Sequence, residues 1–323
     1  MTAAPVPVTV LTGYLGAGKT TLLNRILSEP HGRRYAVIVN ELGEVGIDND
    51  LVVNADEDVL EMNNGCICCT VRGDLIRILD GLMRRRDRFD AILIETTGLA
   101  DPGPVAQTFF VDDGVRAHTT LDAIVTVVDA KNLPARLADS HEAGEQIALA
   151  DVILLNKTDL VSPAELADVE RRIRAINPYA RLHRTERSRI DLDEVLGRNA
   201  FDFARILTIE PDFLEQGHHH HHSEDVASVS LVSDHPLDAD KLFKWLQYML
   251  QSQGADILRL KGILDMKGEE QRFVVQGVHM LLEGDRQRPW QPGERRQSRL
   301  VLIGRHLDQE LLQSSFKACE ARH

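Results

Sequence analysis

The sequence has little of three things that would reveal its class at once: long apolar runs, cysteine and positive charge. No stretch approaches the ~20 continuous apolar residues of a membrane span. The first residues, "MTAAPVPVTVLTG", lack the basic flank and the cleavage pattern of a signal peptide. We therefore expect a cytoplasmic protein with no membrane partner.

Cysteine is too scarce for a disulfide framework. The 323 residues include four cysteines, and three of these lie within the short stretch "CICC". Neighbouring cysteines in a reducing compartment more often bind metal or perform redox chemistry. The thiols therefore predict a functional loop rather than covalent cross-links.

Positive charge is outweighed by negative charge. The chain has 37 Lys and Arg against 50 Asp and Glu, a formal net charge of -13. This balance argues against a general grip on the phosphate backbone of nucleic acid. We expect no nucleic-acid partner.

What the sequence does have is a series of short, nearly continuous apolar strands alternating with helical patterns. Such strands are typical of a sheet that is covered on both faces, and hence of a mostly parallel sheet. The first two thirds of the chain are therefore predicted to form a doubly wound α/β domain. The expected strands are residues 8–12, 35–40, 91–96, 123–129, 152–156 and 180–184.

The pattern breaks at "EPDFLEQGHHHHHSEDVAS", an acidic and His-rich stretch whose composition cannot form a packed core. We predict a first domain over residues 1–213, a His-rich linker over 214–225 and a smaller α+β domain over 226–323. The second domain should contain strands at 226–232, 256–266, 271–281 and 298–304, with helices at 237–250 and 307–319. Its core should include Leu242, Trp245, Leu246, Met249, Leu250 and Cys319.

The stretch "GYLGAGKT" at residues 13–20 fits the phosphate-binding pattern G-x-x-x-x-G-K-[ST] and lies between a strand and a helix, as that motif requires. Its glycines let backbone amides surround phosphate oxygens, while Lys19 adds charge toward the β and γ phosphates and Thr20 offers a hydroxyl to Mg²⁺. The motif and its flanking elements therefore predict a P-loop NTPase fold. The predicted nucleotide contacts are Gly13, Tyr14, Leu15, Gly16, Ala17, Gly18, Lys19, Thr20 and Thr21.

The stretch "NKTD" follows the strand at 152–156, at the sheet edge where ligands of doubly wound folds bind. Asp159 could accept from the ring N–H and the exocyclic amine of guanine, a pair that adenine does not present. Asn156 and the stem of Lys157 would hold the loop against the base. GTP is therefore favoured over ATP.

The residue that serves Mg²⁺ and the attacking water has two candidates. In "ILIETTG", Glu95 ends a strand and Gly98 follows, so the carboxylate would lie near the γ phosphate and the glycine amide could sense it. Asp129, at the end of another strand, is the competitor, although a strand-end Asp is often only a helix cap. We favour Glu95 because the residues after it resemble a flexible switch loop.

Cys66, Cys68 and Cys69 supply three soft ligands on one loop. Three thiolates are one short of a closed structural zinc site, so a position stays open to a carboxylate or to a receiving protein. Such an open site suits metal transfer, and thiolates accept zinc or cobalt. Small residues that only fill a loop and a redox trio remain as alternatives.

Together these segments resemble the CobW-like family of P-loop GTPases, metallochaperones that include the zinc-regulated GTPase metalloprotein activators. The matching segments are "PVTVLTGYLGAGKTTLLN", "VNELGEVGID", "NNGCICCTVRGDL", "ETTGLADPGP" and "NKTD", in family order; "RLKGIL" and "FVVQGV" match the family's C-terminal domain more loosely. Tyr14 stands where phenylalanine is more usual. The sequence shows no clear second guanine-contacting loop after "ARLHRT".

Further metal ligands are predicted in two other segments. Glu41 and Asp48 lie in "NELGEVGID" and could reach Mg²⁺ or the thiol-bound metal, and the resemblance favours Glu41 as a link between the two sites. Solvated loop carboxylates are the alternative. The histidines of the predicted linker favour an accessory metal-gathering run, with a solvated spacer as the alternative. They are His218, His219, His220, His221 and His222.

The sequence thus predicts a GTPase, with GTP and Mg²⁺ as cofactors, that loads zinc or cobalt into a client metalloprotein. A metal buffer whose nucleotide only tunes metal affinity is the alternative. A nucleotide kinase is disfavoured because no arginine-rich lid follows the sheet. The client and the oligomeric state are left open.

Overall fold

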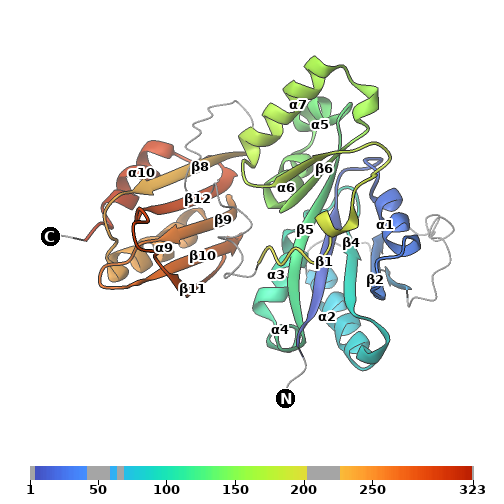
Figure 1. Cartoon of the computed structure of the whole chain (residues 1–323), viewed down its shortest axis with the longest axis horizontal. Helices are drawn as coiled ribbons and strands as arrows, with labels where there is room; N and C mark the ends of the chain where they lie inside the picture. Colours follow the sequence, from blue (N-terminus) through green and yellow to red (C-terminus); the bar gives the residue numbers. More distant parts are fainter. Residues whose placement is uncertain (1–3, 42–58, 64–68, 202–225, 322–323) are drawn as a thin grey trace. The chain divides into compact units, whose positions relative to one another are not determined.

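The computed structural model describes residues 4–41, 59–63, 69–201 and 226–321 (Figure 1). The chain divides into two units. The first runs to Arg171 and includes Ala180–Ala200, and the second comprises Arg172–Tyr179 and the residues from Phe201 onward. The predicted boundary after residue 213 and the predicted linker at 214–225 lie outside the described residues.

The first unit is built on a seven-stranded sheet in the order β3-β2-β4-β1-β5-β6-β7, in which all neighbouring strands are parallel. Strands β4 and β6 are buried along their whole length, as their unbroken apolar sequences predict. The strands are β1 (Val6–Thr12), β2 (Tyr35–Glu41), β3 (Val59–Asn63), β4 (Ala91–Glu95), β5 (Thr119–Asp129), β6 (Val152–Asn156) and β7 (Arg181–Arg184).

Helices flank this sheet (Figure 1). Helices α2, α3 and α4 contact one another, and α5 contacts α6. The α-helices are α1 (Lys19–Ser28), α2 (Cys69–Met83), α3 (Gly103–Val111), α4 (Asp113–His118), α5 (Leu133–Asp139), α6 (His141–Leu149) and α7 (Pro163–Ile176), of which α7 is divided between the two units after Arg171. Three short 3₁₀ helices, η2 (Arg86–Arg88), η3 (Thr158–Leu160) and η4 (Leu192–Glu194), complete the described elements. The predicted parallel α/β fold is confirmed.

Strand β3 was not predicted from the sequence. Its residues "VLEMN" mix apolar and polar side chains, and it lies at the edge of the sheet, paired only with β2 among the described strands. An edge strand needs no continuous apolar run, because one of its sides has no neighbouring strand to pack with. The apolar pattern therefore misses it.

The second unit contains a five-stranded antiparallel sheet in the order β11-β10-β9-β12-β8. The strands are β8 (Val226–Ser233), β9 (Ile257–Leu264), β10 (Gln271–Val278), β11 (Leu281–Pro289) and β12 (Ser298–Arg305), and the helices are α9 (Ala239–Gln253) and α10 (Gln309–Lys317). The predicted pairing of residues 256–266 with 271–281 is confirmed as the β9–β10 pair. The smaller α+β unit is as expected.

Strand β11 was also missed. The expected strand at 271–281 is too long, because β10 ends at Val278 and a tight turn leads directly into β11. Strand β11 is an edge strand with the polar sequence "LLEGDRQRP", most of it exposed. Only its pairing with β10 identifies it as a strand.

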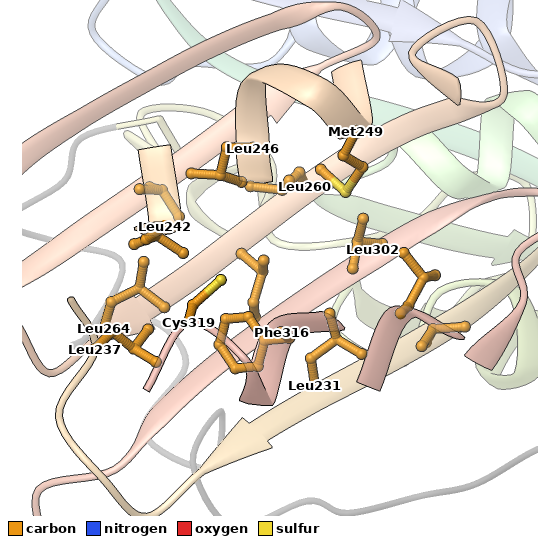
Figure 2. Packing of buried hydrophobic residues seen from close by; sticks show 14 of the residues in the cluster. Leu231, Leu237, Leu242, Leu246, Met249, Leu260, Leu264, Leu302, Phe316 and Cys319 are labelled. Atoms are coloured by element: carbon orange, nitrogen blue, oxygen red, sulfur yellow. The ribbon is translucent and has the colours of Figure 1, made fainter. Parts of the chain in front are cut away.

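Both helices of the second unit bury their apolar sides in one cluster against the sheet (Figure 2). Leu242, Leu246 and Met249 enter it from α9, and Phe316 enters it from α10. Cys319 is buried there as predicted, and burial raises the pKa of its thiol.

Trp245 and Leu250 are half-buried, although the sequence analysis placed both in the core. The indole N–H of Trp245 donates to the hydroxyl of Ser315 at 2.9 Å, which keeps one end of the ring at the border of the cluster.

We predict that Phe316→Ala lowers the free energy of unfolding of the second unit by about 3–5 kcal/mol, because it removes a fully buried ring. The chain's two tryptophans, Trp245 and Trp290, both lie in this unit, so denaturation followed by tryptophan fluorescence reports on it alone. Leu311→Ala is the control on the same helix, since Leu311 is 56% exposed and its change should cost less than about 0.5 kcal/mol. Equal effects of the two changes would contradict the packing described.

Candidate functional site

Four neighbouring parallel strands of the first unit end in polar residues. Thr12 ends β1, Glu95 ends β4, Asp129 ends β5 and Asn156 ends β6, and these strands are adjacent in the order β4-β1-β5-β6. The carboxyl ends of parallel strands meet at one edge of a sheet, which is where doubly wound folds bind ligands. The candidate site is therefore this edge.

The phosphate loop leaves β1 at this edge. Gly13, Gly16 and Gly18 all have positive φ angles, of 139°, 74° and 117°. The buried Nζ of Lys19 turns back and donates to the carbonyl of Gly13 at 2.8 Å and of Tyr14 at 3.5 Å. The loop thereby leads into the N-terminus of α1, where backbone amides and the helix dipole favour an anion.

The side chain of Asn156 connects three loops. Its Nδ2 donates to the carbonyl of Ala17 in the phosphate loop at 2.9 Å. Its Oδ1 accepts from the hydroxyl of Thr185 at 3.2 Å and from the backbone N–H of Ser188 at 2.8 Å. Asn156 is 2% exposed, so these bonds are shielded from water and their loss would leave buried polar groups unsatisfied. The amide therefore holds the phosphate loop against residues 185–188.

Lys157 and Asp159 follow at the same edge. Lys157 has a left-handed backbone, with φ of 61°, and its Nζ donates to Asp129 Oδ2 at 2.7 Å. Asp129 also caps the turn before α5, accepting from the backbone N–H groups of Lys131 and Asn132. Asp159 lies in η3 and is exposed.

The charge state of Asp129 follows from these contacts. Burial alone would raise the pKa of its carboxyl group, but hydrogen bonds from Lys157 and Asn132 outweigh burial and hold the pKa below its ordinary value. Asp129 is thus committed to Lys157 and to the helix turn, which weakens its case as the Mg²⁺ ligand.

The loop after β4 packs on the phosphate loop. The hydroxyl of Thr96 donates to that of Thr12 at 2.8 Å, and both side chains are buried. A Cβ atom on Gly98 would come within 2.6 Å of the backbone nitrogen of Leu15, so no larger residue fits there. Glu95, at the start of this loop, is 8% exposed. The hydroxyl of Thr97 is covered and has no hydrogen-bond partner among the described residues.

The structure thus brings many of the predicted nucleotide contacts to one edge. Ala17 is buried, Thr20 is half-buried, and Leu15 and Thr21 are exposed. A small pocket beside the loop is lined by Tyr14, Leu15 and residues of β5, α5 and α6, and the guanidinium of Arg136 lies 5.1 Å from the centroid of the Tyr14 ring.

Most of the predicted ligands of the metal cargo lie outside the described residues. Cys66 and Cys68, like Asp48 and the histidines at 218–222, lie outside the described residues. Cys69 is the first residue of α2 and Glu41 the last of β2, but the structure does not describe their side chains. Within the described ranges, no group of three His, Cys, Asp or Glu side chains is arranged to hold a metal ion.

A further loop, at residues 185–188, contacts this edge and is not predicted from the sequence. Thr185 and Ser188 follow β7, and Ser188 also donates from its hydroxyl to the carbonyl of Gly18 at 3.2 Å. Ser188 is fully buried with a φ angle of 53°, and Arg187 before it has a φ angle of 51°. Two consecutive left-handed residues that are not glycine have no local sequence signature. Its tertiary contacts with Asn156 and Gly18 reveal the loop.

In the part of the chain that the structure describes, none of the helices is long and apolar enough to span a membrane.

Comparisons with known proteins cover nearly the whole chain. Residues 7–184 match the family described as CobW/HypB/UreG, nucleotide-binding domain, and residues 226–320 match the cobalamin synthesis protein cobW C-terminal domain. The zinc chaperone YjiA of Escherichia coli is 36% identical over 318 residues, covering 97% of this chain and 98% of that protein.

A second relative, the zinc-regulated GTPase metalloprotein activator 1 of Schizosaccharomyces pombe, is 37% identical over 321 residues, covering 87% of this chain and 77% of that protein. The crystal structure of Zn(II)-bound YjiA GTPase from Escherichia coli superposes with a TM-score of 0.81 at 30% identity, covering 99% of this chain and 100% of that one. By sequence and by fold, the chain belongs to the CobW family, with its nucleotide-binding domain followed by its C-terminal domain.

Proposed function

We propose that this chain is a GTP-hydrolysing metallochaperone that carries zinc to a client metalloprotein. The observation that supports this most directly is the junction at Asn156, where the phosphate loop, the "NKTD" stretch and residues 185–188 converge at one sheet edge. The similarity to a zinc chaperone and to a zinc-regulated GTPase metalloprotein activator supports zinc as the cargo, with cobalt as the other metal that thiolates would accept.

Guanine recognition is assigned to Asp159, whose exposed carboxylate can accept two N–H donors from the base. The stem of Lys157, held by Asp129, would cover one face of the base. Residues 185–188 would form the second wall of the base site, because Ser188 is bonded both to Asn156 and to the phosphate loop. A base held between these two loops would lie beside α1, whose N-terminus receives the phosphates.

Hydrolysis is assigned to Lys19, Thr20 and Glu95. The carbonyls of Gly13 and Tyr14 now hold Lys19, and phosphate oxygens would replace them as acceptors. Mg²⁺ prefers oxygen ligands. Thr20 is half-buried, and the hydroxyl of Thr97 is covered and has no hydrogen-bond partner among the described residues, so both hydroxyls fit such an ion near the phosphates. Mg²⁺, when bound, neutralises charge on the phosphate oxygens, and Glu95 would orient the attacking water.

The cargo is assigned to Cys66, Cys68 and Cys69, with Glu41 as a link to the nucleotide site. Strands β2 and β3 run parallel to β1 and end at Glu41 and Asn63, so the chain enters both the switch segment and the cysteine loop from the sheet edge where the phosphate loop begins. That shared edge supports coupling between nucleotide and cargo. The histidines at 218–222 remain proposed as an accessory metal-gathering run.

Phosphate release tests the proposal against a metal buffer. We expect multiple turnovers of GTP with Mg²⁺, altered in rate by added zinc. Absence of turnover at every metal concentration would instead support a buffer in which nucleotide only tunes metal affinity.

We predict that Asp159→Asn weakens GTP binding by about tenfold or more, since it removes a charged acceptor for two donors of guanine. The same change should improve binding of xanthosine triphosphate, whose extra carbonyl can accept from an asparagine amide. Competition of both nucleotides against a fluorescent GTP analogue measures this. Unchanged preference for guanine over xanthine would remove Asp159 from the base site.

We predict that Asp129→Asn weakens GTP binding by several-fold, roughly 1 kcal/mol, because Lys157 loses a half-buried ion-pair partner while the cap before α5 keeps its acceptor oxygen. The Mg²⁺ concentration that gives half-maximal turnover should not change. Asp90→Asn, which removes the exposed partner of Arg34 at the opposite end of β4, is the matched control and should leave GTP affinity unaltered. A raised Mg²⁺ requirement in Asp129→Asn would make Asp129, rather than Glu95, the metal ligand.

We predict that zinc affinity depends on the bound nucleotide. If GTP raises zinc affinity by some factor, zinc must raise GTP affinity by the same factor, with couplings typically ~1–3 kcal/mol. Competition with a chelating dye for the apo, GDP-bound and non-hydrolysable GTP-bound protein measures this, and a variant with Cys66, Cys68 and Cys69 changed to serine is the control. Equal affinities in the three nucleotide states would exclude a GTP-driven switch, and an unchanged tight site in the serine variant would place the metal elsewhere.

A further inference from the structure

A buried glutamine on α6 reaches the loop that follows β4. Gln146 is 1% exposed, and its Nε2 donates to the carbonyl of Gly98 at 3.2 Å and to the carbonyl of Ala100 at 3.1 Å. One side-chain amide therefore uses both of its N–H donors on two backbone carbonyls of the same turn. No motif in the sequence analysis includes Gln146.

This turn is held from two directions. At its start, the backbone N–H of Thr96 donates to the carbonyl of Leu11 at 3.0 Å, which keeps the loop in line with β1. Within it, the N–H of Ala100 donates to the carbonyl of Thr97 at 3.1 Å. Gly98 lies so close to the backbone of Leu15 that the turn cannot approach the phosphate loop any further. Gln146 provides the second attachment, from α6.

The helix that bears Gln146 is itself fixed to the sheet. The backbone carbonyl of Gln146 accepts from the hydroxyl of Thr126 at 2.8 Å, and Thr126 lies in β5 with 1% exposure. Helix α6 ends at Leu149, and β6, the strand that ends at Asn156, begins three residues later. Gln146 thus lies on a rigid element that also leads to the guanine loop.

From this geometry we propose that Gln146 is a positioning residue for GTP hydrolysis, which holds the turn at residues 97–100, and with it Glu95, against the phosphate loop. The proposal rests on the proposed function, because it assigns Gln146 to the hydrolysis attributed to Glu95. Gln146 itself touches the turn and not the reacting atoms. It acts through the loop, so its loss should lower kcat more than it lowers nucleotide affinity.

The chemistry of the contact requires a neutral amide. Both partners are carbonyl oxygens, which accept but cannot donate. A carboxylate of the same shape would face them with acceptors only, and its negative charge would repel them, whereas its protonated form regains one O–H donor. An apolar side chain of similar size would remove the donor, and both buried carbonyls would lose this hydrogen bond.

The first test is Gln146→Leu in the full chain. We expect kcat for GTP to fall by about tenfold or more, as misplacement of a catalytic group does, while the Kd values for GDP and for a non-hydrolysable GTP analogue change less than about twofold. Ile147→Val is the matched control, since Ile147 is the next residue of α6, is 1% exposed and lines the same pocket. The control should lower thermal stability without changing kcat.

The second test is the dependence of kcat on pH in Gln146→Glu. This test also decides whether Gln146 is a positioning residue if Gln146→Leu does not fold. Burial and two facing carbonyl oxygens would raise the pKa of the introduced carboxyl group above the usual ~4.3, so the group regains a proton within the assay range. The ratio of variant kcat to wild-type kcat should therefore be lowest at alkaline pH and rise as the pH falls through that pKa. Asp129 and Arg136 line the same pocket in both proteins, so the ratio isolates the effect of the introduced carboxyl group.

The outcomes separate this proposal from the function on which it rests. A wild-type protein that releases no phosphate overturns the proposed function and the role of Gln146 with it. Wild-type turnover combined with an unchanged kcat in Gln146→Leu, or with a ratio for Gln146→Glu that does not vary with pH, overturns the positioning role alone. A lower kcat with unaltered nucleotide affinity, together with recovery of Gln146→Glu at lower pH, supports it.

Discussion

The amide of Asn156 is the interaction on which the site depends. It lies at the end of a fully buried strand and satisfies one carbonyl of the phosphate loop, one hydroxyl after β7 and one buried N–H of Ser188. In a shielded environment such bonds are strong and their absence is costly, so the three loops are confined to one arrangement. The proposed base site and the proposed phosphate site therefore form as a unit rather than as separate loops.

Close backbone contact gives the same edge its second constraint. A Cβ atom on Gly18 would come within 2.5 Å of the Asn156 amide, and one on Gly98 within 2.6 Å of the Leu15 nitrogen. Glycine at these places lets the phosphate loop contact Asn156 on one side and the loop after β4 on the other. A displacement of the phosphate loop would then also move Asn156 and the loop after β4, because packed elements of this kind move between discrete arrangements. Such an arrangement suits a protein that must report which nucleotide it holds.

The two units solve different physical problems. In the first, a parallel sheet covered by helices buries its strands on both faces and leaves its carboxyl edge for polar loops. In the second, an antiparallel sheet buries one apolar cluster under α9 and α10, with Phe316 and Cys319 at its centre. The second unit has a core of its own, so damage to that core can be separated experimentally from damage to the nucleotide site.

The sequence by itself determined the parts that depend on contiguous residues. Unbroken apolar runs identify the inner strands, and "GYLGAGKT" and "NKTD" predict the phosphate and base loops, because each needs fixed residue types at fixed spacing. The parallel fold and the family followed from these stretches. The sequence does not predict the edge strands β3 and β11, because their pairing with a neighbouring strand defines them and their composition does not.

Only the tertiary structure decided how distant side chains are used. Ser188 donates a hydrogen bond to Gly18 of the phosphate loop, 170 positions away in the sequence. Lys157 donates to Asp129, 28 positions away, and Gln146 donates to Gly98, 48 positions away. Each of these residues is common in sequences of every kind, and nothing in its immediate neighbours distinguishes a structural cap from a partner at the site. Their roles arise when parallel strands bring their carboxyl ends to one edge, since that step, and no local pattern, sets which loops meet.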